Sequence, residues 1–145
     1  MFEGLSNAVN EILAVDSRDL DDRALHEAVI AAQREIDRLS ALQAQLLITW
    51  DARKIWGENG SKSPGHCYAS ATGLSIPDAK HLVRRARKLS SMPLTSEAFA
   101  NGELSTSRVD LLVRTNQADV SSTFERDEDI LLNAVKTLSF DSDPQ

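Results

Sequence analysis

The longest uninterrupted helical pattern lies in the first third of the chain. Apolar residues between Leu25 and Trp50 recur at spacings of three and four, and neither proline nor glycine occurs from Arg23 to Trp56. This spacing places the apolar side chains on one face of an α-helix. We therefore expect one helix over about residues 22–54, roughly 45 Å long at ~1.5 Å per residue. The apolar stripe consists of Leu25, Val29, Ala32, Ile36, Leu39, Leu42, Leu46 and Trp50.

A helix of this length limits the fold classes open to the chain. At 145 residues the chain has the length of one domain, and an aromatic content of 5% with four prolines and six glycines favours helices over sheets. The sequence therefore predicts an all-α bundle, a single helical domain over residues 1–145. A helix so long is usually paired with another, in the same chain or in a second copy. A homodimer through this helix is one expected assembly, and the apolar stripe alone does not distinguish pairing within the chain from pairing between two copies.

The middle of the chain contains a succession of helix start and stop signals. Ser63, which precedes a proline, fits the N-cap of one helix, and Gly73 fits its end. Ser75 fits the N-cap of the next helix, which ends before Met92-Pro93 because the residue before a proline disfavours helical geometry. We expect two helices over about residues 64–91.

The last third predicts shorter helices over about residues 95–138. Thr95 and Ser105 are candidate N-caps of two of them, and a capping box at residues 122–125 opens a final helix. The apolar positions of this helix are Phe124, Ile130, Leu131, Ala134, Val135 and Leu138. Its acidic start is read as stabilising the helix dipole rather than binding a cation. That acidic group comprises Glu125, Asp127, Glu128 and Asp129.

Charge is distributed unevenly along the chain, whose net charge is −6. Residues 1–50 hold nine acidic and four basic residues, whereas residues 51–92 hold three acidic and eight basic ones. Residues 93–145 return to an acidic balance, with ten acidic and four basic residues. A cationic segment between acidic flanks indicates either an anionic partner or an electrostatic fit between the segments.

The cationic residues concentrate on the second of the two middle helices. At about 100° per residue, its apolar residues share one arc and a cationic arc lies opposite. We interpret the cationic arc as a surface for phosphates or guanine edges of DNA, with His81 and Arg85 at the groove margin. The alternative is a protein-interaction or dimerisation domain whose basic helix pairs with the acidic flanks. The candidate DNA-binding residues are Lys80, His81, Arg84, Arg85, Arg87 and Lys88.

Five positions match the packing requirements of a helix-turn-helix. This motif needs a small residue in its first helix, a glycine at the turn and apolar residues at fixed distances beyond the glycine. Together with the basic outer face of the second helix, the match favours double-stranded DNA as the partner. The five residues are Ala69, Gly73, Leu74, Ala79 and Leu82.

Several short motifs resemble one known family. They are D-A-R at the end of the long helix, G-L-S before an R-R-A basic helix, L-x-x-M-P-x-T, and G-E-L-S. Over about residues 22–140 the chain is similar to the actinobacterial domain of unknown function 222, also called the 13E12 repeat family. Proteins of that family usually continue into an HNH endonuclease domain, so the resemblance implies the N-terminal, DNA-targeting part of such a protein or a shortened relative. The order of G-L-S, basic helix and G-E-L-S is also similar to the DNA-binding domain of ParB partition proteins.

No catalytic or metal site is predicted. An HNH site needs a metal ligand and a general-base histidine within one compact hairpin and helix, whereas His26, His66 and His81 lie far apart in the sequence. Cys67 is read as a small buried thiol, because neighbours on a helix point about 100° apart and His66 is not positioned to activate it. We expect this chain to contain no catalytic residue, no metal site and no cofactor site.

The sequence also predicts a compartment. With one cysteine the chain forms no internal disulfide, and no apolar stretch reaches the ~20 residues of a membrane span. The first residues lack the positive region of a secretory signal. We therefore expect a cytoplasmic protein without a membrane partner.

Overall fold

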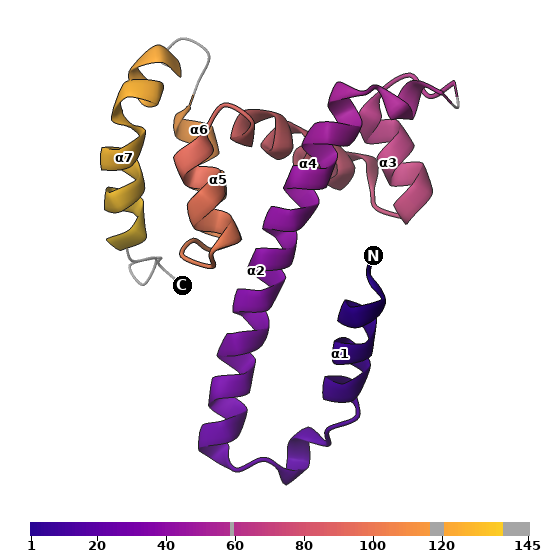
Figure 1. The fold of residues 1–145 in the computed structure, drawn as a ribbon, viewed down its shortest axis with the longest axis vertical. Helices are drawn as coiled ribbons and strands as arrows, with labels where there is room; N and C mark the ends of the chain where they lie inside the picture. The colour runs from indigo at the N-terminus through magenta and orange to yellow at the C-terminus, as the bar shows by residue number, and fades with distance from the viewer. Residues whose placement is uncertain (59, 117–120, 138–145) are drawn as a thin grey trace. The chain divides into compact units, whose positions relative to one another are not determined.

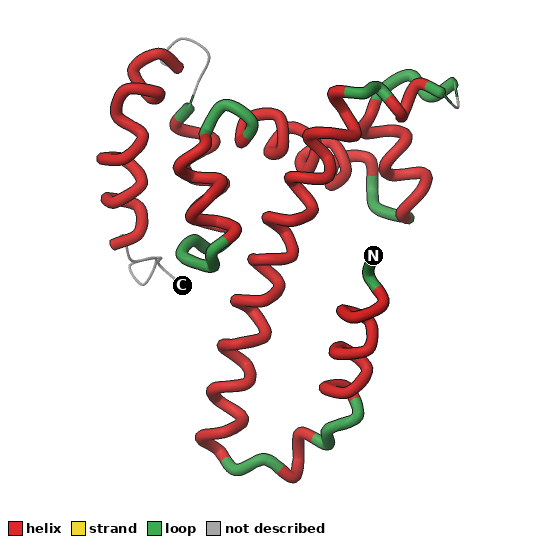
Figure 2. The backbone as a smooth tube through the Cα atoms, in the orientation of Figure 1, coloured by secondary structure: helices red, strands yellow, loops and turns green. Residues whose placement is uncertain are grey.

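The computed structural model describes residues 1–58, 60–116 and 121–137, without the side chains at 121–123 and 125. Every regular element in these segments is a helix, which confirms the predicted all-α class (Figures 1 and 2). Short 3₁₀ turns, η1 (Ser17–Asp19) and η2 (Ile55–Gly57), follow the first two α-helices. The α-helices are α1 (Glu3–Leu13), α2 (Asp22–Ala52), α3 (Pro64–Thr72), α4 (Ile76–Leu89), α5 (Pro93–Ala100), α6 (Thr106–Thr115) and α7 (Ser121–Thr137).

The chain divides into two compact units, and the boundary falls inside α2. The N-terminal unit comprises Met1–Arg34 and the C-terminal unit comprises Glu35–Gln145. The predicted long helix is confirmed, with bounds within two residues of those expected. At its start, Asp21 Oδ1 accepts a 2.7 Å hydrogen bond from the backbone amide of Ala24, as an N-cap does.

No residue of the N-terminal unit, which is described throughout, is buried. Ile12 of α1 is 72% exposed and Val29 of α2 is 63% exposed. The turn after α1 is fixed by local hydrogen bonds. Arg18 donates hydrogen bonds to Asp16 from its guanidinium at 3.0 and 2.9 Å and from its backbone amide at 3.0 Å, and these bonds fix the start of η1. This unit therefore has no buried hydrophobic core.

The core of the C-terminal unit is built from helices that follow α2 and from the second half of α2 itself. Helix α7, yellow in Figure 1, packs beside α5 and α6, and α4 packs on α5 and α6. Burying a large apolar side chain stabilises a fold by about 1.5–3 kcal/mol. The largest apolar side chains that are fully buried in the described chain are Phe99, Met92, Leu104, Leu112 and Val109.

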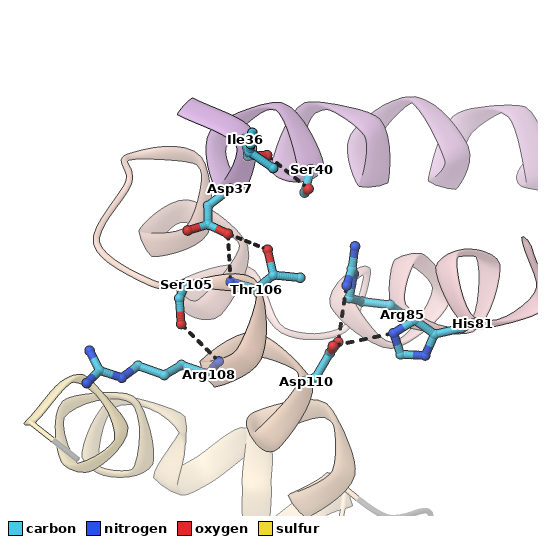
Figure 3. A network of polar contacts seen from close by, with 9 residues as sticks. All are labelled: Ile36, Asp37, Ser40, His81, Arg85, Ser105, Thr106, Arg108 and Asp110. Atoms are coloured by element: carbon cyan, nitrogen blue, oxygen red, sulfur yellow. Dashed lines mark hydrogen bonds and ion pairs between the residues drawn. The ribbon is translucent and has the colours of Figure 1, made fainter. Parts of the chain in front are cut away.

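The face of α2 that enters this core is not the predicted apolar stripe. Its buried residues are Asp37, Ala41, Ala44 and Leu47, whereas Ile36 of the stripe is 55% exposed. Alanines let neighbouring helices approach closely, which a wider side chain would prevent. Asp37 is buried as a helix cap, because its Oδ1 accepts hydrogen bonds from the backbone amide of Thr106 at 3.1 Å and from the Thr106 hydroxyl at 2.5 Å (Figure 3).

Three of the predicted helix caps are confirmed. The hydroxyl oxygens of Ser63, Ser75 and Ser105 each accept a hydrogen bond from the backbone amide three residues further on, at 3.1 to 3.3 Å. These caps begin α3, α4 and α6. Each satisfies a backbone amide that has no acceptor within its own helix.

The fourth predicted cap, Thr95, is wrong. Helix α5 begins at Pro93, so Thr95 lies inside its first turn and is fully buried. The cap comes from α7, where Glu128 accepts hydrogen bonds from the backbone amides of Leu94 and Thr95 at 3.1 and 3.4 Å and from the Thr95 hydroxyl at 3.1 Å. Glu128, which was expected to stabilise the dipole of its own helix, therefore stabilises a different helix.

Helix α7 exposes and buries some residues differently from the prediction. Phe124 is buried as expected, but Ile130 is 65% exposed. Leu132, which the prediction did not include, is buried in its place. The capping box at residues 122–125 and the apolar position Leu138 lie outside the described residues or side chains.

Candidate nucleic-acid interface

Helices α3 and α4 are joined by a turn of three residues and pack on each other along their lengths. Gly73 ends α3 in the left-handed region at φ 79°, which glycine adopts without steric cost. The five positions singled out in the sequence lie in α3, in α4 or in the turn between them. Ala69 and Ala79 are buried, Leu74 and Leu82 are half-buried, and Leu82 packs against the core.

The first turn of α3 lies against the start of α4. A Cβ built on Gly65 would stand 2.6 Å from Cγ and 3.4 Å from Cα of Lys80. No side chain fits at that distance, so the close approach requires glycine at residue 65. The stem of Lys80 therefore lies over Gly65, while Lys80 as a whole remains exposed.

A hollow of about 210 Å³ opens between the start of α3 and residues 80–87 of α4. One side is formed by residues 63–65 and the other by Lys80, Val83, Arg84 and Arg87 of α4. Lys80 and Arg84 are exposed. Neither forms an ion pair with another residue that the structure describes. Three of the six predicted DNA-binding residues, Lys80, Arg84 and Arg87, are thus brought together at one hollow.

Arg87 also borders the hollow, but it is paired within the chain. Its Nε and Nη2 donate hydrogen bonds of 2.6 and 2.9 Å to the carboxylate of Asp51 at the end of α2. Trp56 Nε1 donates to the same carboxylate at 3.1 Å. The hydrogen bond from Arg87 lowers the pKa of Asp51 below its usual value, against the opposing effect of burial. Arg87 remains 54% exposed, so the pair fixes its direction without burying it.

Arg85 does not lie at the surface, which corrects its predicted place at the groove margin. Its side chain is only 5% exposed, and its Nη1 lies 3.3 Å from Oδ1 of Asp110 on α6 (Figure 3). Its guanidinium carbon stands 6.0 Å from the centre of the Phe99 ring, a distance that allows a cation–π contact. Helix α6 covers this side of α4, so Arg85 joins the core instead of facing solvent.

His81 and Lys88 contact α6 or the residue that follows it, as Arg85 does, but neither is buried. His81 Nε2 is 3.4 Å from Oδ2 of Asp110, and the imidazole is 49% exposed (Figure 3). Lys88 is half-buried and donates a 3.0 Å hydrogen bond from Nζ to the backbone oxygen of Asn116. Both side chains are directed at α6 or its end, away from the hollow.

Three further exposed cations lie outside the basic helix and were not among the predicted DNA-binding residues. Arg53 and Lys54 directly follow Ala52, the last residue of α2, and are exposed, and Lys62 precedes the cap of α3 and is exposed. Lys54 adopts a left-handed backbone, φ 53°, where the chain leaves α2. The sequence signal that these three residues share is the cationic balance of residues 51–92, to which they contribute together with the basic residues of α4.

The described residues include no group of three or more His, Cys, Asp or Glu side chains placed to hold a metal ion. His66 is exposed, and its Nδ1 lies 2.6 Å from the hydroxyl oxygen of Ser63. The histidine thus contacts the cap of its own helix. Cys67 is half-buried, whereas the sequence predicted a buried thiol.

These features define a class of protein: an all-α domain with a cationic surface at a tightly packed pair of helices. The family model described as Domain of unknown function (DUF222) matches residues 3–140, so the chain belongs to this family. That result confirms the resemblance read from the short motifs. The curated proteins and the solved structures contain no match to the chain.

No helix in the described part of the chain combines the length and apolar character that crossing a membrane requires.

Proposed function

We propose that this chain binds double-stranded DNA through the cationic surface at α3 and α4, used as a helix-turn-helix. The observation that carries the proposal is the exposed, unpaired state of Lys80 and Arg84 at one hollow in a chain whose net charge is −6. Elsewhere the acidic balance of the chain repels a polyanion. The cationic surface therefore sets how the protein meets DNA.

Phosphate contacts supply most of the sequence-independent affinity of such a protein. Arg53, Lys54 and Lys62 add cations on the segments next to the hollow, and each is exposed. Arg85 is removed from the set because it is buried against Asp110. The DNA surface that we propose comprises Arg53, Lys54, Lys62, Lys80, Arg84 and Arg87.

We further propose that the chain is the targeting part of an HNH endonuclease-type protein and has no nuclease activity of its own. The separation of its three histidines supports this proposal, since His81 contacts Asp110 and His66 contacts Ser63. The test is incubation of the purified chain with plasmid DNA and Mg²⁺. Cleavage that a point change within the chain abolishes would contradict the proposal.

A salt titration on a mixed-sequence duplex tests the binding. We expect wild-type affinity to fall with salt, and Arg84→Ala to lower the slope of log K against log salt by about 0.9, the value for one phosphate contact. Arg34→Ala removes the same charge from an exposed arginine of the N-terminal unit and should leave the slope unchanged. Absence of salt-dependent binding by the wild-type chain at about 50 mM salt would contradict the proposal.

A homodimer is the second candidate, favoured by one observation. Large apolar side chains of α1 and the first half of α2 are exposed, among them Ile12, Leu13, Val29 and Ile30. A second copy that covered them would bury apolar area without any change in the C-terminal unit. Sedimentation equilibrium tests this assembly, and a chain that stays monomeric at about 100 μM, a concentration well above a 1 μM dissociation constant, would contradict it.

A further inference from the structure

The hollow between the start of α3 and residues 80–87 of α4 has the charge and shape of a site for one tetrahedral oxyanion. Three cationic side chains, Lys80, Arg84 and Arg87, border it from α4. Among the described acidic residues, Asp51 alone forms an ion pair with one of these three cations, Arg87. Within the described chain, the charges of Lys80 and Arg84 are therefore not neutralised.

The wall opposite these cations consists of backbone and small groups. Residues 63–65 are Ser, Pro and Gly, and Pro64 and Gly65 are buried. Because Gly65 has no side chain, the stem of Lys80 packs directly on the backbone of α3 at the edge of the hollow. The hollow can therefore accept a group that approaches both the backbone of α3 and the cations of α4.

The two helices that form the hollow are held firmly in place. Gly65 meets Lys80 so closely that a Cβ would stand 2.6 Å from its Cγ, and Ser63 and Ser75 cap the two helices. The hydrogen bonds between Arg87 and Asp51 direct that guanidinium along the rim. Because the backbone wall and the Arg87 guanidinium are positioned before binding, these parts of the site lose little conformational entropy when the ligand arrives.

We propose that this hollow binds a single phosphate group, with Lys80 and Arg84 as its principal ligands. The inference rests on the proposed function, in which that group is one phosphate of the DNA backbone. Two cationic side chains that contact the oxygens of one phosphate group also fit free inorganic phosphate. The two sources are separated by experiment.

The first arm titrates the ¹⁵N-labelled full chain with inorganic phosphate at constant ionic strength, made up with chloride. The backbone amide of Gly65 is the reporter, since it lies in the wall of the hollow. We expect saturable shifts of Gly65 that chloride alone does not produce. Lys80→Gln and Arg84→Gln should each weaken phosphate binding about tenfold, as expected for losing one charge-assisted hydrogen bond. The control Arg34→Gln should leave it unchanged.

The second arm adds a mixed-sequence duplex at low salt. Shifts of Gly65 on adding DNA, reversed by excess phosphate, would support the hollow as a site for a backbone phosphate. Phosphate binding at Gly65 without any DNA binding would support the hollow and overturn the proposed function. DNA binding that leaves Gly65 unshifted and is unaffected by Lys80→Gln would overturn the hollow and leave the proposed function standing. Shifts of Gly65 that follow ionic strength alone would also overturn the hollow as a phosphate site.

Discussion

The two units of this chain share one helix and yet are stabilised in different ways. In the N-terminal unit, α1 and the start of α2 are amphipathic but bury nothing. In the C-terminal unit, the second half of α2 contributes Ala41, Ala44 and Leu47 to a core. Both halves of α2 follow the same apolar period. The difference teaches that a helical period predicts a helix and does not tell which of its faces is covered.

The largest test of this comparison removes one apolar side chain from each unit. Phe99→Ala should lower the free energy of unfolding by about 3–5 kcal/mol, because it leaves a cavity in a fully packed core. Ile12→Ala, at a residue 72% exposed, should change it by less than about 0.5 kcal/mol. Urea denaturation of both variants measures the two values. A large, concentration-dependent loss in Ile12→Ala would break the comparison by showing that a second copy covers α1.

The second test changes one carboxylate in each unit. Glu128→Gln should cost about 2–3 kcal/mol, since the buried carboxylate accepts three hydrogen bonds at the start of α5. Glu11→Gln, in α1, should have no measurable effect because Glu11 is exposed. Thermal or urea unfolding reports both. Equal losses in the two variants would mean that Glu128 does not hold α5.

The third test uses two glycines whose surroundings are open. A Cβ at either Gly73 or Gly4 would meet nothing within 4 Å, so only the backbone conformation distinguishes them. Gly73→Ala should cost about 1 kcal/mol, because φ 79° is strained for any residue with a Cβ. Gly4→Ala, in helix α1, should cause no loss. A stable Gly73→Ala variant would show that the turn between α3 and α4 adopts another conformation.

The smallest expected effect comes from one ion pair in each unit. Asp51→Asn should cost about 0.5–1 kcal/mol at pH 7, a value reduced by the partial exposure of Arg87. Arg87 lowers the pKa of Asp51 in the folded state, so the pair stabilises above the unfolded pKa and the effect is lost as pH falls below about 4. Wild type and Asp51→Asn should therefore converge in acid.

The matched variant for that pair is Asp16→Asn. Arg18 lowers the pKa of Asp16 as well, but both groups are exposed at the surface and solvent screens the pair. Urea unfolding at pH 7 and pH 3 should detect no difference between this variant and wild type. A loss as large as that of Asp51→Asn would contradict the distinction between the two units.

Much of the fold was predictable because its signals are local. The bounds of α2, α3 and α4 follow from apolar spacing, from Ser63 and Ser75, and from Gly73, each of which acts within a few residues. Thr95 failed for a non-local reason. Helix α5 begins at Pro93, and the amides of Leu94 and Thr95 in its first turn are taken by Glu128, 33 residues beyond Thr95 in the chain, a partner that no local rule identifies.

The candidate site was predictable in part. The cationic arc of α4 was located correctly for Lys80 and Arg84, which are exposed. Arg85 lies about 40° from the buried Leu89 on the same helix, and whether that margin is covered depends on a neighbour. Here α6 brings Asp110 against it. The hollow itself needed residues 63–65, which carry no charge and gave no signal of a binding site.

The sequence by itself determined the helical class, most helix boundaries, the cationic middle segment and the family. These properties depend on propensity, capping and composition, which act over a few residues or are sums over many. Tertiary structure alone decided which face of α2 is buried, that Arg85 joins the core, that Arg87 pairs with Asp51, and that Gly65 lies under Lys80. Each of these depends on contacts between residues distant in the sequence, where packing and charge pairing select among faces that local rules leave equivalent.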